Sequence, residues 1–432
     1  MQQRQWFRSA LVAGATALVL VACSSGADDD DAAADTAADA TSTTGGQGTG
    51  DTLPAPEGLP DFYATPDPVP ELDPGTLLAS EPVEAPGLAG TAYRVMYVSQ
   101  ALSGEAIAVT GVVALPEGEA PDGGFPVIAW AHGTTGIADV CAPSIEAAES
   151  IPVANDFLER GYALAATDYE GLGTPGRHPY IVGESEGRGV IDSVRAARQL
   201  EGADLSDRYL VWGHSQGGHA AMFALHIAEE WAPELDLVGV VAGAPPSQFE
   251  LLNAALQASP FKHYLIMVAA GFNAAYGDDG APLDAVLTPA GVEMVDLVDE
   301  GCDAVAEAMA GVDSSALIGA DPATVPAWLE ALQANDPGRF PEPAAAPLLI
   351  IHGGNDEQIP VVASALMFDQ LCAIGQDQSR WVYPGQSHSG VIAPSLSDMT
   401  TWIDNRFAGD ATPDAMVPGG QPDVEVQRCP TG

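Results

Sequence analysis

A serine stands at the centre of the segment whose residue types and spacing point most directly to covalent chemistry. The segment 213–217 reads Gly-His-Ser-Gln-Gly, a G-x-S-x-G pattern that follows an apolar run and precedes a helical sequence. In that context the pattern predicts a sharp strand-to-helix turn with Ser215 at its apex, because small flanking residues let the two elements approach closely. The backbone N–H of Gln216, at the start of the helix, would hold a developing oxyanion. The segment therefore predicts a nucleophilic serine.

A serine hydroxyl is a weak nucleophile until a base accepts its proton and an acid orients that base. On a turn of this kind the acid and then the histidine follow the serine along the chain. Asp356, in the loop after the apolar run 348–351, is the acid that we expect, with Glu357 and Asp377 as alternatives. His388 is the only one of the eight histidines beyond Asp356, and it lies in a Gly/Ser-rich loop. The competing interpretations are a helix cap for Asp356 and a structural histidine for His388.

A second oxyanion donor is expected from the glycine-containing loop that follows the apolar run 125–131. Gly133 would let the backbone pass close to a substrate carbonyl. The backbone N–H of Thr134 or Thr135 would then donate to the oxyanion, and a threonine hydroxyl could add a further bond. The sequence leaves open which of the two threonines donates.

Short apolar runs that alternate with helical segments must position these residues. Residues 91–115 alternate like a β-hairpin or meander. The later strand candidates begin near residues 125, 162, 208, 235, 347 and 379, and the helical segments are 153–160, 184–201 and 219–231. This order predicts an α/β fold, with a mostly parallel central sheet, helices on both faces and functional loops at the carboxyl ends of the strands.

The alternation of strand and helix patterns stops between residues 247 and 346. This stretch has a helical pattern, is interrupted by proline and is rich in Ala, Leu and Met. We interpret it as an inserted helical cap or lid. It would divide the α/β core into a first part, 61–246, and a second part, 347–432. No internal repeat is visible.

The N-terminal segment has the pattern of an export signal. Residues 1–22 carry two arginines followed by an apolar stretch that is short for a transmembrane span. The segment ends at Cys23 after Leu-Val-Ala, which resembles the lipobox of bacterial lipoproteins, so we expect Cys23 to be lipidated and to anchor the chain in the cell membrane. The alternative is an ordinary signal with an incidental cysteine and an extracellular protein. Residues 23–60 are rich in Asp, Ala, Thr and Gly, which predicts a flexible acidic linker.

Four further cysteines follow: Cys141, Cys302, Cys372 and Cys429. An even number in an exported chain predicts two disulfides, and the residues alone leave all three pairings open. Neither a CxxC motif nor a Cys/His cluster with zinc spacing is present, so we expect no structural metal. The proposed chemistry needs no cofactor.

Charge and composition narrow the function classes. The 432 residues include 60 acidic and 14 basic side chains, a net charge of −46, with a single lysine, Lys262. The negative electrostatic field of such a chain repels the phosphate backbones of nucleic acids, which excludes nucleic-acid binding. The hydrophobic content of 47% supports a large core. We expect a monomer.

Taken together, several motifs in one order resemble the secretory lipases, the lipase A-type branch of the α/β-hydrolases. The matching motifs are AHGTTG at 131–136, CAPS at 141–144, DYEGLG at 168–173, GHSQGGH at 213–219, HGGND at 352–356 and His388. The resemblance implies a Ser215, His388 and Asp356 triad, and hydrolysis of carboxylic esters that include acylglycerols. It also implies a helical cap, and disulfides that join Cys141 to Cys302 and Cys372 to Cys429.

One departure from the fungal members of this family bears on specificity. They carry an acidic residue in the oxyanion loop where this chain has Thr134 and Thr135. Short- or medium-chain esters are therefore expected as well as long-chain lipids. A serine peptidase or acyltransferase on the same triad, and a surface binding protein without catalysis, are the alternative functions.

Overall fold

The computed structural model of this chain describes residues 51–409 and 423–430. The predicted signal peptide, the predicted lipidation site at Cys23 and the predicted linker up to residue 50 lie outside the described residues. Within these ranges, no helix combines the length and the apolar character that a bilayer crossing requires.

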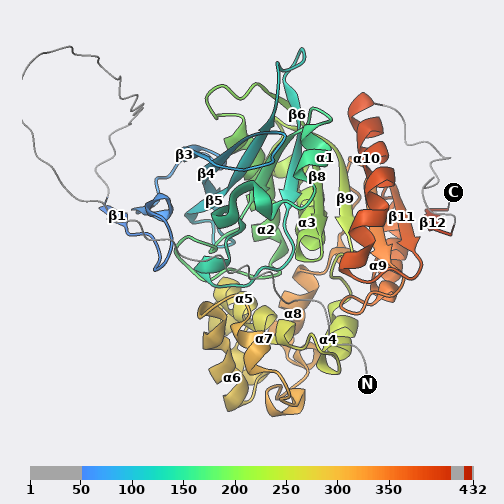
Figure 1. Cartoon of the computed structure of the whole chain (residues 1–432). Helices are drawn as coiled ribbons and strands as arrows, with labels where there is room; N and C mark the ends of the chain where they lie inside the picture. Colours follow the sequence, from blue (N-terminus) through green and yellow to red (C-terminus); the bar gives the residue numbers. More distant parts are fainter. Residues whose placement is uncertain (1–50, 410–422, 431–432) are drawn as a thin grey trace, which may run out of the picture. The chain divides into compact units, whose positions relative to one another are not determined.

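A ten-stranded sheet forms the centre of the described chain (Figure 1). Its order is β12-β11-β10-β9-β8-β6-β7-β5-β4-β3, and the strands from β11 to β7 in this order run parallel. The strands are β3 (Leu77–Val83), β4 (Gly90–Gln100), β5 (Ala106–Pro116), β6 (Phe125–Ala131), β7 (Ala163–Thr167), β8 (Leu205–His214), β9 (Asp236–Gly243), β10 (Leu348–Gly353), β11 (Gln378–Tyr383) and β12 (Glu425–Arg428). The remaining pairs are antiparallel and include the hairpin β4–β5. The mostly parallel sheet agrees with the predicted fold class.

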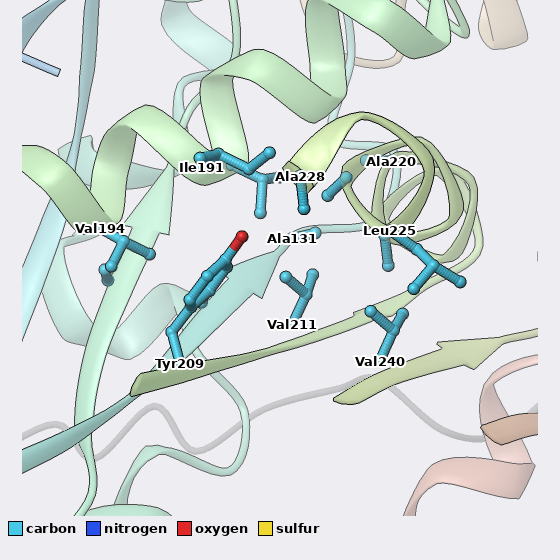
Figure 2. Close-up of a cluster of buried hydrophobic side chains, with 14 of the residues drawn as sticks. Ala131, Ile191, Val194, Tyr209, Val211, Ala220, Leu225, Ala228 and Val240 are labelled. Carbon is cyan, nitrogen blue, oxygen red and sulfur yellow. The ribbon is translucent and has the colours of Figure 1, made fainter. Parts of the chain in front are cut away.

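Helices cover both faces of this sheet because its parallel strands are apolar on both sides. One face packs against α2 (Gly183–Ala197), α3 (Gln216–Trp231) and α9 (Val361–Ile374), and the other against α1 (Ala154–Leu158) and α10 (Ile392–Ala408). Successive side chains of a strand point to opposite faces of the sheet. In β6, Val127 and Ala129 face the first group of helices, while Ile128 and Trp130 face the second. Figure 2 shows the first face, where the side chains of Tyr209, Val211 and Val240 meet those of Ile191 and Leu225.

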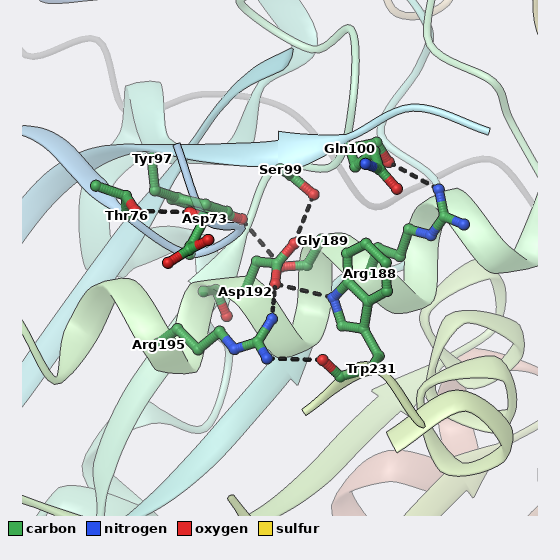
Figure 3. Close-up of polar contacts among 12 residues, drawn as sticks. Asp73, Thr76, Tyr97, Ser99, Gln100, Arg188, Gly189, Asp192, Arg195 and Trp231 are labelled. Carbon is green, nitrogen blue, oxygen red and sulfur yellow. Dashed lines mark hydrogen bonds and ion pairs between the residues drawn. The ribbon is translucent and has the colours of Figure 1, made fainter. Parts of the chain in front are cut away.

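A buried carboxylate fastens α2 to its neighbours. Asp192, on α2, accepts hydrogen bonds from Ser99 Oγ at 2.7 Å, Trp231 Nε1 at 2.9 Å and Arg195 Nη1 at 3.0 Å (Figure 3). Burial raises the pKa of Asp192 to about 6, although these hydrogen bonds act in the opposite direction. The contacts join α2 to β4 on one side and to α3 on the other, which fixes the helix layer that supports the G-x-S-x-G turn.

Between β9 and β10 the chain folds into a group of helices (Figure 1). They are α4 (Phe249–Gln257), α5 (His263–Gly280), α6 (Pro289–Val295), α7 (Ala304–Ala308) and α8 (Pro326–Ala334). Their apolar side chains form a separate cluster that includes Phe272 and Trp328, whose rings stack at 5.9 Å. The helical content agrees with the sequence-based expectation, while the domain boundaries and the role as a lid stay predictions.

Two disulfides tie segments that are distant along the chain. Cys141, after β6, is bonded to Cys302 in the helical insertion, and Cys372 on α9 is bonded to Cys429 after β12. These are the pairs that the family resemblance implied. The first closes a loop across 161 positions and joins the insertion to the segment that follows the predicted oxyanion loop.

The predicted flexible linker differs from the structure at its end. Residues 51–60 were assigned to it, yet β1 (Asp51–Leu53) pairs antiparallel with β2 (Thr65–Asp67). Ala55 and Leu59 pack against the buried cluster around Tyr63. The few apolar residues of segment 51–60 pack against residues that follow them in the chain. The polar composition of the segment does not reveal this packing, so the predicted linker extended too far.

Candidate active site

The serine of the G-x-S-x-G segment occupies a sharp turn between β8 and α3. Ser215 has φ 60° and ψ −122°, a conformation that side-chain-bearing residues rarely adopt. Its backbone is held on both sides, because Ser215 N donates to the Gly243 carbonyl at 2.8 Å and Ser215 O accepts from His219 N at 3.1 Å. Such a conformation costs on the order of 1–3 kcal/mol and persists only where surrounding contacts enforce it. This is the predicted turn with Ser215 at its apex.

Two glycines make the turn possible by close backbone contact. A Cβ atom on Gly217 would lie 1.9 Å from the Ala131 carbonyl oxygen, and one on Gly213 would lie 2.1 Å from the Gly217 carbonyl oxygen. Real Cβ atoms do not approach oxygen so closely, and the neighbouring atoms are backbone of β6 and of α3. The G-x-S-x-G pattern is therefore required by packing at this position.

The expected acid and histidine are in direct contact. Asp356 Oδ2 accepts a hydrogen bond from His388 Nδ1 at 2.7 Å, and the Asp356 side chain has no solvent exposure. Asp356 Oδ1 accepts from the backbone N–H groups of Gln358 and Ile359 at 2.9 and 2.8 Å. The carboxylate is thus held by its own loop while it orients the imidazole.

A second imidazole contacts the same carboxylate. His352 Nε2, at the end of β10, lies 3.1 Å from Asp356 Oδ2 and 3.0 Å from the Ile359 carbonyl oxygen, so this nitrogen carries a proton. Burial alone would raise the pKa of Asp356, but the hydrogen bonds from His352 and His388 outweigh it and hold the pKa well below its usual range. Asp356 is therefore ionised at neutral pH. His352 was not singled out from the sequence, although it lies in the HGGND motif.

The alternative acids occupy other places. Glu357 Oε2 accepts from the backbone N–H of His388 at 3.1 Å, so it contacts the main chain rather than the ring. Asp377 directly precedes β11, at the amino end of the strand, whereas His388 follows its carboxyl end. Of the three acids that the sequence left open, only Asp356 bonds to the His388 imidazole.

The other ring nitrogen of His388 is buried and has no hydrogen-bond partner among the described residues. With Nδ1–H donating to Asp356, Nε2 is the acceptor nitrogen of the neutral imidazole. His388 lies beside the serine turn, since its ring centroid is 4.6 Å from that of His214, the residue before Ser215. No hydrogen bond joins Ser215 Oγ to His388 Nε2 in this structure, and catalytic bonds of this kind often form only with substrate present.

The predicted oxyanion loop passes directly beside the serine. A Cβ atom on Gly133 would lie 3.2 Å from the His214 carbonyl oxygen and 3.8 Å from Ser215 Cβ, so a larger residue would crowd the turn. Of the two threonines, Thr135 is exposed, while Thr134 is partly buried and hydrogen-bonds through Oγ1 to the Tyr180 hydroxyl at 2.7 Å. The loop therefore lies next to Ser215, while its role as an oxyanion donor stays a prediction.

A buried polar network supports Gln216, whose backbone was proposed as an oxyanion donor. The Gln216 side chain donates from Nε2 to Glu186 Oε1 and to His178 Nε2, both at 2.8 Å. Burial lowers the pKa of His178 to about 3, so its ring is neutral and accepts this bond. Glu186 Oε2 in turn lies 3.0 Å from His219 Nδ1. The sequence contained no signal for Glu186, which lies 30 residues before Gln216 and reaches it only through tertiary packing.

An apolar pocket opens beside Ser215 and extends into the helical insertion. Ser215 lines it together with Tyr180, Phe249, Leu252, Phe272 and Trp328. Such a surface suits a hydrocarbon chain rather than a charged ligand. Among the described residues, no group of three or more His, Cys, Asp or Glu side chains is arranged to hold a metal ion.

Comparisons with known proteins show what this chain is similar to. The sequence model of a family described as secretory lipase matches residues 144–415. A secreted triacylglycerol lipase of Malassezia globosa is 25% identical over 381 residues, which cover 81% of this chain and 80% of that protein. Lipase A of Moesziomyces aphidis is 27% identical over 66% of this chain and 59% of its own length. A Mycobacterium tuberculosis protein named a probable inactive lipase is 28% identical over 55% of this chain and 61% of its own length.

Solved structures show the same fold. Candida antarctica lipase A in its closed state has a TM-score of 0.73 and 21% sequence identity, and the match covers 86% of this chain and 91% of that chain. The rice cell wall degrading esterase LipA from Xanthomonas oryzae has a TM-score of 0.64 and 19% identity, over 78% of this chain and 98% of that chain. The α/β-hydrolase fold expected from the motifs is thus confirmed.

Proposed function

The chain belongs to the secretory lipase family and is a carboxylic ester hydrolase, and we propose that it acts through a Ser215, His388 and Asp356 triad. The observation that carries this proposal is the 2.7 Å bond from His388 Nδ1 to Asp356, which leaves Nε2 buried and without a hydrogen-bond partner beside the serine turn. A buried polar atom without a partner is costly unless a ligand or a reaction uses it. The substrate class is lipid or small ester.

In the proposed reaction, Ser215 Oγ attacks the ester carbonyl carbon while His388 Nε2 accepts the serine proton. The carbonyl π electrons move to oxygen, and this oxyanion accepts bonds from the Gln216 N–H and from the loop at Thr134 and Thr135. The C–O bond to the alcohol then breaks, and the alcohol leaves with the proton from His388. Water repeats the sequence on the acyl-enzyme and releases the acid.

The acyl group would lie in the apolar pocket beside Ser215. Its lining comes largely from α4, α5 and α8, so the helical insertion would act as a cap over the bound chain. The Malassezia globosa relative is named a triacylglycerol lipase, and this name supports acylglycerols as one substrate class here. Secreted relatives also support export of this chain. We further propose that the exported chain is anchored in the membrane through Cys23.

A non-catalytic binding protein is the second candidate, because one relative is named a probable inactive lipase. Labelling with a fluorophosphonate separates the two candidates, since the probe forms a covalent adduct only with an activated serine. We expect one adduct, on Ser215, in the folded protein and none in Ser215→Ala. Turnover of a p-nitrophenyl ester but not of a p-nitroanilide peptide would separate ester hydrolysis from peptidase activity. Absence of both adduct and turnover would favour the binding protein.

A further inference from the structure

A pair of hydroxyl groups joins the oxyanion loop to the wall of the apolar pocket. Thr134 Oγ1 and the Tyr180 hydroxyl oxygen are 2.7 Å apart, although 46 positions separate them in the sequence. We propose that the Thr134 hydroxyl donates to the oxyanion, and that Tyr180 is the positioning residue that directs it by donating to Thr134 Oγ1. This proposal rests on the proposed ester hydrolysis at Ser215 and names two side chains that serve it.

The location of the pair supports this role. Thr134 follows Gly133, at which an added Cβ atom would lie 3.8 Å from Ser215 Cβ. Tyr180 lines the same apolar pocket as Ser215 and is 4% exposed. An ester attacked by Ser215 with its acyl chain in this pocket would lie between Ser215 and Tyr180, and the Thr134 hydroxyl is bonded to Tyr180 at this wall of the pocket. An oxyanion donor must be placed in advance at this point, because its effect depends on preorganisation.

Either hydroxyl of the pair could donate, and the proposal assigns the donor role to Tyr180. Each hydroxyl has one hydrogen, so if Tyr180 donates to Thr134 Oγ1, the threonine hydrogen remains free for the oxyanion. Burial raises the pKa of Tyr180 well above its usual range, and the nearby Tyr264 adds to this effect. The phenol therefore keeps its proton during turnover. A chain of hydroxyls that ends on an anion strengthens each bond through mutual polarisation.

Tyr180 is held in place by contacts with both the insertion and the core. A Cβ atom on Gly271 of α5 would lie 2.4 Å from Tyr180 N, so this helix packs backbone to backbone against Tyr180. Tyr180 N donates to the His178 carbonyl at 2.8 Å, and the next residue, Ile181, donates its N–H to Glu186 Oε1 at 3.0 Å. The phenol thus projects from a rigid backbone, as positioning of a second hydroxyl requires.

Four variants test the proposal: Thr134→Val, Thr134→Ser, Tyr180→Phe and the double variant Thr134→Val with Tyr180→Phe. Thr134→Val keeps the side-chain shape and removes the donor, so we expect kcat to fall on the order of 100-fold with KM nearly unchanged. Thr134→Ser restores the hydroxyl and should keep kcat near the wild-type value. Tyr180→Phe keeps the ring in the pocket, and we expect kcat to fall about tenfold, the scale of one hydrogen bond.

The coupling of the two residues is the decisive readout. In the Thr134→Val background, Tyr180→Phe should have no further effect on kcat, because the hydroxyl that it directs is gone. Tyr276→Phe, the same change on α5 outside the pocket lining, serves as the matched control and should leave kcat unchanged. Circular dichroism and thermal unfolding of every variant show whether a loss of activity comes from loss of structure.

Three outcomes would overturn the proposal. Wild-type kcat in folded Thr134→Val would exclude the threonine hydroxyl as a donor. A loss in Tyr180→Phe that is equally large in both backgrounds would show that the phenol acts without the threonine. Changes in KM alone would assign the pair to substrate binding. Failure of the proposed function itself is distinguishable, because wild-type protein would then show no ester turnover, or Ser215→Ala would be equally active.

Discussion

His214 donates a hydrogen bond from Nε2 to the backbone carbonyl of His388 at 3.0 Å. The residue before the proposed nucleophile therefore holds the main chain of the proposed base. Burial and, to a smaller extent, the neighbouring His388 lower the pKa of His214 to about 3, so the ring stays neutral above this pH and its single hydrogen is committed to this bond. Together with the Glu357 contact to the His388 N–H, this bond fixes the histidine loop from both sides.

His214→Phe tests this positioning. The variant keeps an aromatic ring but removes the donor, so the His388 loop loses one backbone contact. We expect the rate of fluorophosphonate labelling at Ser215 to fall about tenfold, the scale of one hydrogen bond, with little change in folding. His226→Phe, a half-buried histidine stacked on Phe340 away from the site, is the matched control. An unchanged labelling rate in His214→Phe would contradict the role.

Replacement of the proposed nucleophile separates activity from strain. Ser215→Ala should lower ester hydrolysis by roughly four orders of magnitude or more. Ser215→Gly should be equally inactive yet more stable than Ser215→Ala by about 1 kcal/mol, because glycine adopts φ 60° without strain. Turnover of a p-nitrophenyl ester and urea unfolding measure the two effects. Equal stability of the two variants would show that the turn is not strained.

The low pKa of Asp356 predicts a pH-dependent contribution to stability. A carboxyl whose pKa is lower in the folded state contributes stability that is fully present above its ordinary value of 3.8 and is lost as the pH falls towards the folded pKa. Asp356→Asn lacks this contribution. It should therefore unfold at lower urea than wild type at pH 7, and the gap should narrow at pH 3 and below. A difference in stability between the two proteins that does not change with pH would contradict an ionised carboxylate hydrogen-bonded to both His352 and His388. The variant should also lose most of its esterase activity.

The two disulfides are expected to act differently. Gly136 of the oxyanion loop packs on the first bridge, since a Cβ atom there would lie 2.5 Å from Cys141 Sγ. Replacing Cys141 and Cys302 with alanine should reduce both stability and kcat, because the bridge joins this loop to the insertion. Replacing Cys372 and Cys429 should reduce stability with kcat retained at temperatures where the protein is folded. Each loss of stability should be of the order of 2–5 kcal/mol. Equal effects on kcat would contradict the link to the oxyanion loop.

The predicted lipid anchor is tested through Cys23. Lipidation requires the thiol, so Cys23→Ala should move the protein from the membrane fraction to the medium or the soluble fraction of the envelope. Fractionation with and without detergent measures this change. Retention of Cys23→Ala in the membrane fraction would contradict anchoring at this residue, and release of the unchanged protein would favour the ordinary export signal.

Much of the fold was predictable from local pattern. The strands β6, β8, β9 and β10 are short apolar runs that end in glycine-containing turns. The helices α2 and α3, which lie between these strands in the chain, have apolar residues at helical spacing. The edge strand β12 was not predicted, because its four residues gain their structure by pairing with β11 next to a disulfide. The helix α10 was also missed, although its buried Trp402 packs on the sheet.

By itself, the sequence determined the serine turn, because G-x-S-x-G between a strand and a helix is a local requirement of backbone packing. It also narrowed the base to His388 by chain order, and narrowed the acid to three residues. Only the tertiary structure decided that Asp356 contacts the imidazole while its neighbour Glu357 contacts the backbone, because adjacent side chains point in different directions. The Glu186 network and the Thr134–Tyr180 pair also depended on tertiary structure, since such bonds join segments whose spacing carries no periodic signal.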